Sequence, residues 1–171
     1  MTSIAQAPMP GDAQARTSLR HTLSSYATGV AVVTTVDTGG EPVGLTVNSF
    51  TSVSLDPPLV LWCLNRDSAS YPAFLAAGGY AVNVLRSSQE GVARRFAGSR
   101  PDRFAGLAWR LGHAGQPVLG GALAHLVCRT HRRLTLGDHL VLVGEVIAHG
   151  AAGGSPLVFH DHRYLTSTPP A

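Results

Sequence analysis

The chain has 171 residues, 44% of them hydrophobic and 13% charged, which suits one domain with a sizeable core. Its basic residues are arginines scattered along the chain, and the formal charge is only +3, so the concentrated basic face of a nucleic-acid-binding protein is not expected. The N-terminus lacks a signal-peptide pattern and no apolar run approaches the ~20 residues of a membrane helix, so we expect a cytoplasmic protein without membrane contact.

The chain begins with residues 1–15, an Ala/Pro/Gln-rich stretch that is expected to be a disordered tail. A first helix is expected from a cap at Thr17 or Ser18, because apolar residues then recur at helical spacing. A hairpin signal at 37–40 follows a β-branched run. The expected strands are residues 30–36, 42–47, 50–54, 59–64, 80–85, 107–111, 122–131, 140–149 and 156–159.

Two further helices are expected. One covers residues 68–77, and the other opens with a capping box at 87–90 and runs to about Phe96. Gly91 in this second helix costs roughly 1 kcal/mol relative to alanine, so the helix depends on packing. Residues 166–171 read as a loose C-terminal tail, which leaves 16–165 as the domain.

Many short strands with few helices indicate a mainly β fold, an antiparallel barrel. Residues 30–33, 59–64 and 140–143 are apolar at successive positions, so both faces of these strands should be buried. The barrel interior accounts for one face, and a helix or a second subunit must cover the other. A homodimer meets this requirement. Cys63 and Cys128 lie in such apolar runs and are expected to be free thiols.

Small polar side chains gather at Thr46, Asn48 and Ser49, around Val47, and just before a Pro-Pro corner. Their hydroxyl and amide groups do not titrate near neutral pH, so they indicate hydrogen bonds to a flat, polar-edged ligand and not proton chemistry. The alternative is a solvated strand face, because Ser and Thr are common there.

Three other features have both a functional and a structural interpretation. The loop from Asn65 to Ser68 leads into a helix and suits a phosphate, or it is a plain capped turn. Arg94 and Arg95 belong to a ligand-binding site, or they only complement the dipole of their helix. His139, after a Gly-Asp turn, is a switchable donor or a structural histidine. No Rossmann fingerprint, P-loop or metal-ligand spacing is present, and no metal is expected.

Taken together, the Thr-Gly-Val, Thr-Val-Asn-Ser-Phe, Asp-Pro-Pro, Ala-Arg-Arg-Phe and Gly-Asp-His elements resemble the short-chain flavin reductase family. These proteins are the reductase components of two-component flavin-dependent monooxygenases. The resemblance runs from about Leu19 to Tyr164. It implies an antiparallel Greek-key split barrel that takes FAD or FMN, uses NADH or else NADPH, and supplies reduced flavin to a partner monooxygenase by diffusion.

The resemblance also implies which residues form the site. His139 would face the nicotinamide and steer hydride transfer. The implied cofactor-binding residues are Thr28, Gly29, Val30, Thr46, Val47, Asn48, Ser49, Asn65, Ser68, Phe96, Arg163 and Tyr164.

Two alternative functions remain open: an oxidoreductase with permanently bound flavin, and a non-catalytic flavin-binding split-barrel dimer.

Overall fold

The computed structural model describes residues 13–166. Residues 1–12 and 167–171, which hold most of the two expected tails, lie outside the described residues. The helices of the described chain are α1 (Ala13–Ser24), α2 (Tyr71–Ala76), the short 3₁₀ helix η1 (Ser87–Gln89) and α3 (Glu90–Ala97).

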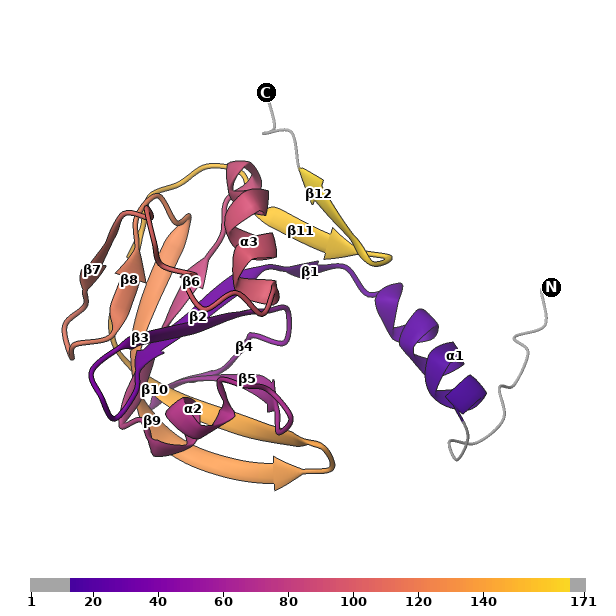
Figure 1. Cartoon of the computed structure of the whole chain (residues 1–171), viewed down its shortest axis with the longest axis horizontal. Coiled ribbons are helices and arrows are strands. Elements are labelled where there is room, and N and C mark those ends of the chain that lie inside the picture. The colour runs from indigo at the N-terminus through magenta and orange to yellow at the C-terminus, as the bar shows by residue number, and fades with distance from the viewer. Residues whose placement is uncertain (1–12, 167–171) are drawn as a thin grey trace.

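Antiparallel strands dominate the described chain (Figure 1). The main sheet has the strand order β3-β2-β6-β9-β10-β5-β4, and it curls so that β3 and β4 are its free edges. This incompletely closed sheet confirms the split β-barrel expected from the sequence. The strands are β1 (Thr28–Gly29), β2 (Ala31–Val36), β3 (Pro42–Val47), β4 (Thr51–Leu55), β5 (Pro58–Asn65), β6 (Gly79–Val84), β7 (Trp109–Leu111), β8 (Pro117–Leu119), β9 (Ala124–Leu136), β10 (His139–Ala151), β11 (Leu157–His160) and β12 (Arg163–Thr166).

The turn between β2 and β3 forms as its sequence predicts. The Asp37 carboxylate accepts backbone N–H bonds from Gly39 at 2.8 Å and from Glu41 at 2.9 Å. Gly40 has a φ of 85°, a conformation that glycine adopts without a steric penalty. The turn residues therefore fix the register in which β3 lies beside β2.

The barrel interior is built around Trp62, which is fully buried. Its ring meets Phe74 edge-on at a centroid distance of 5.0 Å and Tyr80 at 5.7 Å. Phe74 belongs to α2, so this short helix packs onto the core. The other buried members of the cluster are Ala31, Val33, Val47, Val60, Leu64, Val82, Cys128, Leu140 and Leu142.

A second cluster joins α3 to β2 and β3. Phe96 is only 1% exposed and packs edge-on against Phe104 at 5.0 Å, in one cluster with Val30 and Leu157. Gly44 permits this approach, since a Cβ there would lie 2.8 Å from the Phe96 ring. Phe96 is thus a core residue of this cluster, and its burial explains its place in the sequence without any ligand.

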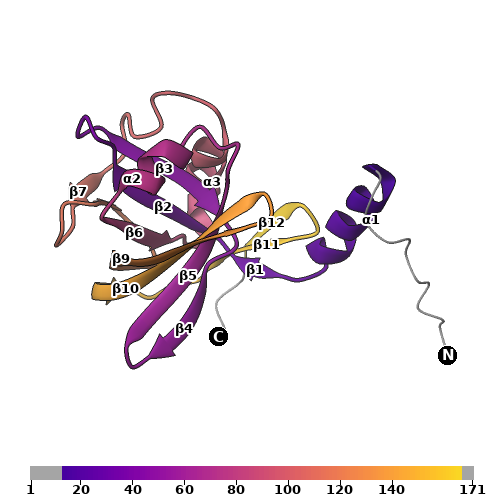
Figure 2. The same ribbon diagram turned by 90° about the horizontal axis from the view of Figure 1, so that it is seen from below.

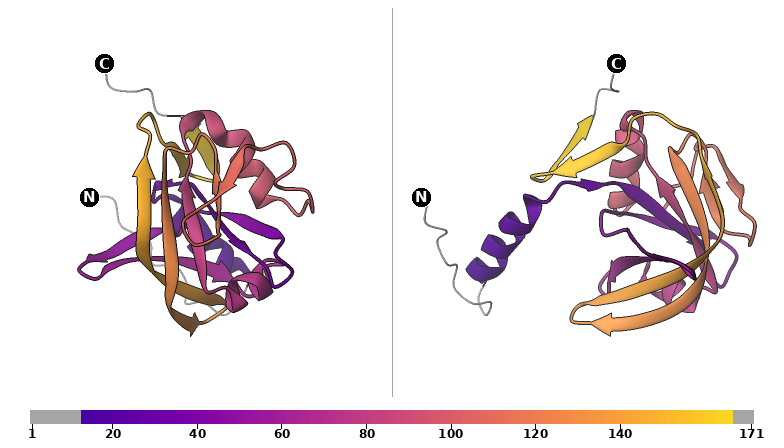
Figure 3. Two further views of the ribbon diagram at one scale, coloured as in Figure 1. Left: turned by 90° about the vertical axis from the view of Figure 1, so that its left-hand side faces the viewer. Right: turned by 180° about the vertical axis from the view of Figure 1, so that it is seen from behind.

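The N-terminal helix α1 stands away from the barrel and is joined to it through β1 (Figures 1 and 3). Its apolar residues are largely exposed, at 50% for Leu19 and 63% for Leu23, and Tyr26 just after it is 77% exposed. The hairpin of β4 and β5 also extends from the barrel (Figure 2), and the Asp56–Pro57 peptide bond in its turn is cis. None of the helices within residues 13–166 is long and apolar enough to cross a membrane.

Several boundaries differ from the expectation. α1 begins at Ala13, so the last three residues of the expected tail are helical and the cap at Thr17 or Ser18 is not used. α2 begins at Tyr71, after a turn, and not at residue 68. β9 and β10 each extend over 13 residues, because they pair with each other even through the arginine-rich part of β9. The three short strands β1, β8 and β12 were missing from the expected set.

The expected burial of both strand faces is confirmed in β2, where every residue from 31 to 35 is buried. In β5 and β10, only alternate residues are buried. On their other face Cys63 lies opposite Val141 and Leu61 lies opposite Val143, and all four are half-buried. This four-residue set, called here the Leu61 face, is covered only in part by the described chain. Both cysteines are free, as expected.

Candidate functional site

Two adjoining cavities lie where the chain enters β2 and where it leaves β3. The first, called here the Tyr164 cavity, has a volume of about 170 Å³, and the second, the Thr28 cavity, about 490 Å³. Asn48 lines both, so they adjoin. The Tyr164 cavity is lined by Val30, Thr46, Val47, Asn48, Ala97, Phe159 and Tyr164. The Thr28 cavity is lined by Tyr26, Ala27, Thr28, Gly29, Asn48, Ser49, Phe50 and Thr51.

Sheet pairing brings these segments together. The register of β2 and β3 sets Ala31 opposite Val47, so the residues just before Ala31 lie beside those just after Val47. The Val30 N–H donates to the Leu157 carbonyl at 3.2 Å, and the Val30 carbonyl accepts from Leu85 at 2.9 Å. Backbone hydrogen bonds therefore hold the Val30 wall and set it beside the end of β3.

The hydroxyl groups of the polar run are mostly used within the protein. Thr46 Oγ1 donates to the Ala93 carbonyl of α3 at 2.7 Å. Ser49 Oγ accepts from the Cys63 N–H at 3.0 Å and lies 3.3 Å from the Cys63 carbonyl oxygen. These two side chains position the segment, so its backbone and the exposed Asn48 amide remain to meet a ligand.

The hydroxyl of Thr28 differs from those of Thr46 and Ser49. Its oxygen is buried and has no hydrogen-bond partner among the described residues. A buried hydroxyl without a partner is costly, and a polar group of a bound ligand can satisfy it. Gly29 beside it leaves open room, because a Cβ built there meets nothing within 4 Å. The Thr28 cavity thus offers an unsatisfied polar group next to free space.

Aromatic residues close the other side of the Tyr164 cavity. Phe159 and Tyr164 are cross-strand partners with ring centroids 5.2 Å apart. The guanidinium of Arg94 lies over the Tyr164 ring, 5.1 Å from its centroid, and is itself paired with Glu90 at 2.7 Å. Burial raises the pKa of the Tyr164 hydroxyl, so it stays neutral at physiological pH and can donate a hydrogen bond.

Replacing Arg94 with methionine should loosen this wall. We expect Tyr164 to lose a cation–π contact worth about 0.5–1 kcal/mol, and the KM for the flavin that the sequence resemblance implies to rise about two- to fivefold. Arg95→Met is the matched control, because Arg95 stands at the same helix end but bonds the Ala105 carbonyl instead. Steady-state flavin titrations of both variants check this, and equal effects would contradict it.

His139 lies at the start of β10, opposite Asn65 at the end of β5. The turn before it contains Gly137, with a φ of 58°. His139 Nδ1 lies 2.7 Å from an Asp138 carboxylate oxygen, and this contact lowers the pKa of Asp138. A separate cavity of about 350 Å³ beside them is lined by Arg66, Asp67, Tyr71 and Asp138.

The structure thus groups most of the residues predicted for the site, in two places. Phe96 lies in the core, one residue before the wall residue Ala97. Ser68 bonds the Ser70 N–H in the turn before α2, and Arg163 is exposed in β12. The residues that line the paired cavities are Thr28, Gly29, Val30, Thr46, Val47, Asn48, Ser49 and Tyr164, and those at the separate place are Asn65 and His139.

Sequence reasoning missed several wall residues, above all Phe159. Its position two residues after the buried Leu157 places both on the inner face of one strand, and that alternation was the available signal. For Arg94 the sequence left open a ligand site or the dipole of its helix, and it did not predict a contact with Tyr164. Its contact with Tyr164 joins two segments far apart in the chain, which no local pattern encodes.

The paired cavities fit a flat ligand with a polar edge. The apolar wall of Val30, Val47, Phe159 and Tyr164 can take a ring face, while Thr28 and Asn48 offer polar contacts nearby. An isoalloxazine ring has this combination of apolar face and polar edge. The residues present therefore fit the flavin that the sequence resemblance implies.

Known proteins support this interpretation. A probable flavin reductase from Rhizobium meliloti (strain 1021) is 42% identical over 149 residues, which cover 87% of this chain and 48% of that protein. This chain thus spans about half the length of that relative. NADH:FAD oxidoreductase SgcE6 of Streptomyces globisporus, solved with NAD and FAD fragments, is 40% identical with a TM-score of 0.87, covering 96% of this chain and 99% of that chain.

A nitrilotriacetate monooxygenase component B homologue from Mycobacterium thermoresistibile is also similar. It is 38% identical with a TM-score of 0.87, covering 93% of this chain and 92% of that chain. The sequence profile of the family described as Flavin reductase like domain matches residues 23–168. The chain therefore belongs to the flavin reductase-like domain family.

Proposed function

We propose that the chain is an NAD(P)H-dependent flavin reductase that reduces FAD or FMN and releases it to a partner monooxygenase. The observation that carries this proposal is the pair of adjoining cavities, with an apolar aromatic wall and an unsatisfied Thr28 hydroxyl. Similarity to an NADH:FAD oxidoreductase and to a monooxygenase component B supports the same activity and favours NADH.

The nicotinamide and the flavin supply the hydride chemistry themselves when they are bound. The chain has to hold the two rings face to face and keep water out. Val30, Val47 and Tyr164 provide an apolar wall that would hold a ring face, and Thr28 and Asn48 would bind the polar edge. No carboxylic acid or histidine lines the two cavities, which suits a reaction that needs no proton transfer by a side chain.

NADH oxidation in air by the purified protein, with FAD, FMN or no added flavin, tests this function. We expect turnover that depends on added flavin and saturates in both substrates. Turnover without added flavin, with the flavin retained on gel filtration, would indicate a permanently bound cofactor instead. No turnover with any flavin and either NADH or NADPH would overturn the proposal.

We expect His139→Gln to raise the KM for NADH about fivefold and to leave the flavin KM unchanged, the scale of one lost hydrogen bond. The family resemblance assigns His139 to the nicotinamide, and His139 lies beside Asn65, outside the residues that line the paired cavities. His131→Gln, on the neighbouring strand β9, is the control. A fall in kcat alone, or an equal rise of both KM values, would contradict a role in nicotinamide binding.

We also propose that the protein works as a homodimer. The support is apolar surface that the described chain leaves partly uncovered, namely the Leu61 face and the exposed side of α1. Exposed apolar patches of this kind mark protein interfaces. Light scattering coupled to gel filtration measures the mass of the protein in solution. We expect twice the chain mass for the wild type and a shift toward the monomer for Leu61→Lys.

A further inference from the structure

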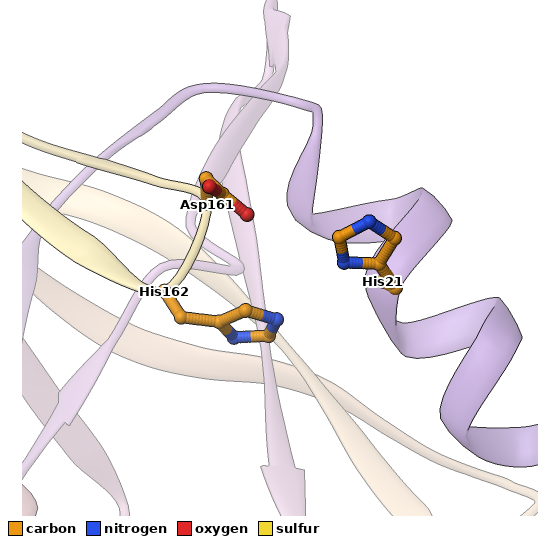
Figure 4. Close-up of side chains that lie close together, drawn as sticks. All are labelled: His21, Asp161 and His162. Atoms are coloured by element: carbon orange, nitrogen blue, oxygen red, sulfur yellow. The ribbon is translucent and has the colours of Figure 1, made fainter.

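Three potential metal ligands meet between α1 and the β11–β12 hairpin, outside the three cavities described above. His21 lies in the last turn of α1, and Asp161 and His162 form the tip of the hairpin (Figure 4). One ligand atom from each lies within 4.8 Å of the other two. His21 stands about 140 positions before Asp161 and His162 in the chain, so sequence spacing gives no sign of this cluster.

The hairpin tip holds its two ligands in an unusual conformation. Asp161 and His162 have φ values of 46° and 59°, so both central residues of this two-residue turn are left-handed. Asp and His tolerate this region better than most residues other than glycine. The Asp161 N–H also donates to the Ser24 carbonyl at 3.0 Å, which ties the turn to the end of α1. Backbone geometry, and not only the side chains, sets the spacing of the cluster.

None of the three side chains has a hydrogen-bond or ion-pair partner within residues 13–166. His21 and Asp161 contribute only backbone groups to the hydrogen bonds of this region. All three are exposed, so they can turn toward a shared ion at little cost. Tetrahedral Zn²⁺ with bonds of ~2.0–2.2 Å places its ligand atoms roughly 3.5 Å apart, so the side chains need to close by about 1 Å.

We propose that His21, Asp161 and His162 bind a divalent transition-metal ion, with Zn²⁺ as the best fit, and that the ion clamps α1 to the β11–β12 hairpin. Two imidazoles and one carboxylate suit Zn²⁺ and other divalent first-row transition metals, whereas Mg²⁺ and Ca²⁺ prefer sites built of oxygen atoms. Three protein ligands leave the remaining position to water. The site requires no flavin, so its test is independent of the proposed reductase activity.

The clamp joins two segments that border the candidate site. The chain after α1 leads directly into Tyr26, Ala27 and Thr28 of the Thr28 cavity. The hairpin carries Phe159 and Tyr164 of the Tyr164 cavity on either side of its tip. An ion at the tip would therefore restrain both walls from one point.

Titration calorimetry with Zn²⁺ tests the site, using tag-free protein stripped with a chelator. We expect one ion per chain with the wild type and no heat with Mg²⁺. His162→Asn and His21→Gln should each weaken binding at least ~10-fold, because loss of a direct ligand should exceed the loss of an outer-shell partner. Asparagine accepts the left-handed conformation, so His162→Asn keeps the turn. His113→Gln, an exposed histidine outside the cluster, is the control.

Wild-type affinity in both cluster variants, or equal weakening in His113→Gln, would overturn the site and leave only adventitious surface binding. Hydrogen exchange tests the clamp separately. We expect Zn²⁺ to slow exchange of the α1 amides in the wild type and not in His162→Asn. Unchanged exchange in the wild type at saturating Zn²⁺ would overturn the clamp.

Discussion

Replacing Gly144 with alanine is expected to destabilise the protein by about 2–3 kcal/mol. A Cβ at this position would lie 2.3 Å from the Tyr80 hydroxyl oxygen and 2.9 Å from Cys128 Cβ. Tyr80 and Cys128 are fully buried, and the Tyr80 ring is already in contact with Trp62. Since the surrounding core is full, the ring can move only by displacing other buried side chains.

Gly91→Ala is the matched control for this prediction. Gly91 is exposed in α3, and a Cβ there meets nothing within 4 Å. We expect this change to stabilise the protein by about 0.5–1 kcal/mol, because alanine loses less backbone entropy in a helix. Urea unfolding of both variants measures the difference. A Gly144→Ala protein within 0.5 kcal/mol of the wild type, about the scale of a neutral surface change, would contradict the packing argument.

Local patterns predicted most of the barrel. The β-branched run of β2 and the Asp37 turn after it appear where the sequence places them, because both depend on neighbouring residues. The short strands β8 and β12 were missed, since each is only three or four residues long. They are stabilised by their partners β7 and β11 and not by their own composition. The length of β9 likewise depends on pairing with β10.

In the candidate site, too, some features follow from neighbouring residues and others depend on distant contacts. Thr46 belongs to a polar run that the sequence itself shows, and Thr28 was predicted from the family resemblance. What each hydroxyl does was not predictable, because the partner of Thr46 is the carbonyl of Ala93 in a distant helix, while Thr28 has none in the described chain. Phe96 is buried against Gly44 of β3, a contact that no local pattern encodes, and its role at the flavin stays a prediction.

The unsatisfied hydroxyl of Thr28 leads to the second strong prediction. Thr28→Val keeps the shape of the side chain and removes the hydroxyl. We expect the flavin KM to rise about tenfold, because a polar group of the ligand then loses its partner in a partly enclosed cavity. Stability without ligand should stay equal or rise by up to about 1 kcal/mol, because a buried polar group without a partner is removed.

Thr35→Val is the control and should show the opposite pattern. The Thr35 hydroxyl is buried and donates to the Gly79 carbonyl at 2.9 Å, away from both cavities. Its loss removes a buried hydrogen bond, so we expect a destabilisation of about 1–2 kcal/mol and an unchanged flavin KM. Urea unfolding and steady-state kinetics on the two variants measure both quantities. If Thr28→Val destabilises the ligand-free protein and leaves the flavin KM unchanged, then the hydroxyl has a partner within the fold and does not face the flavin.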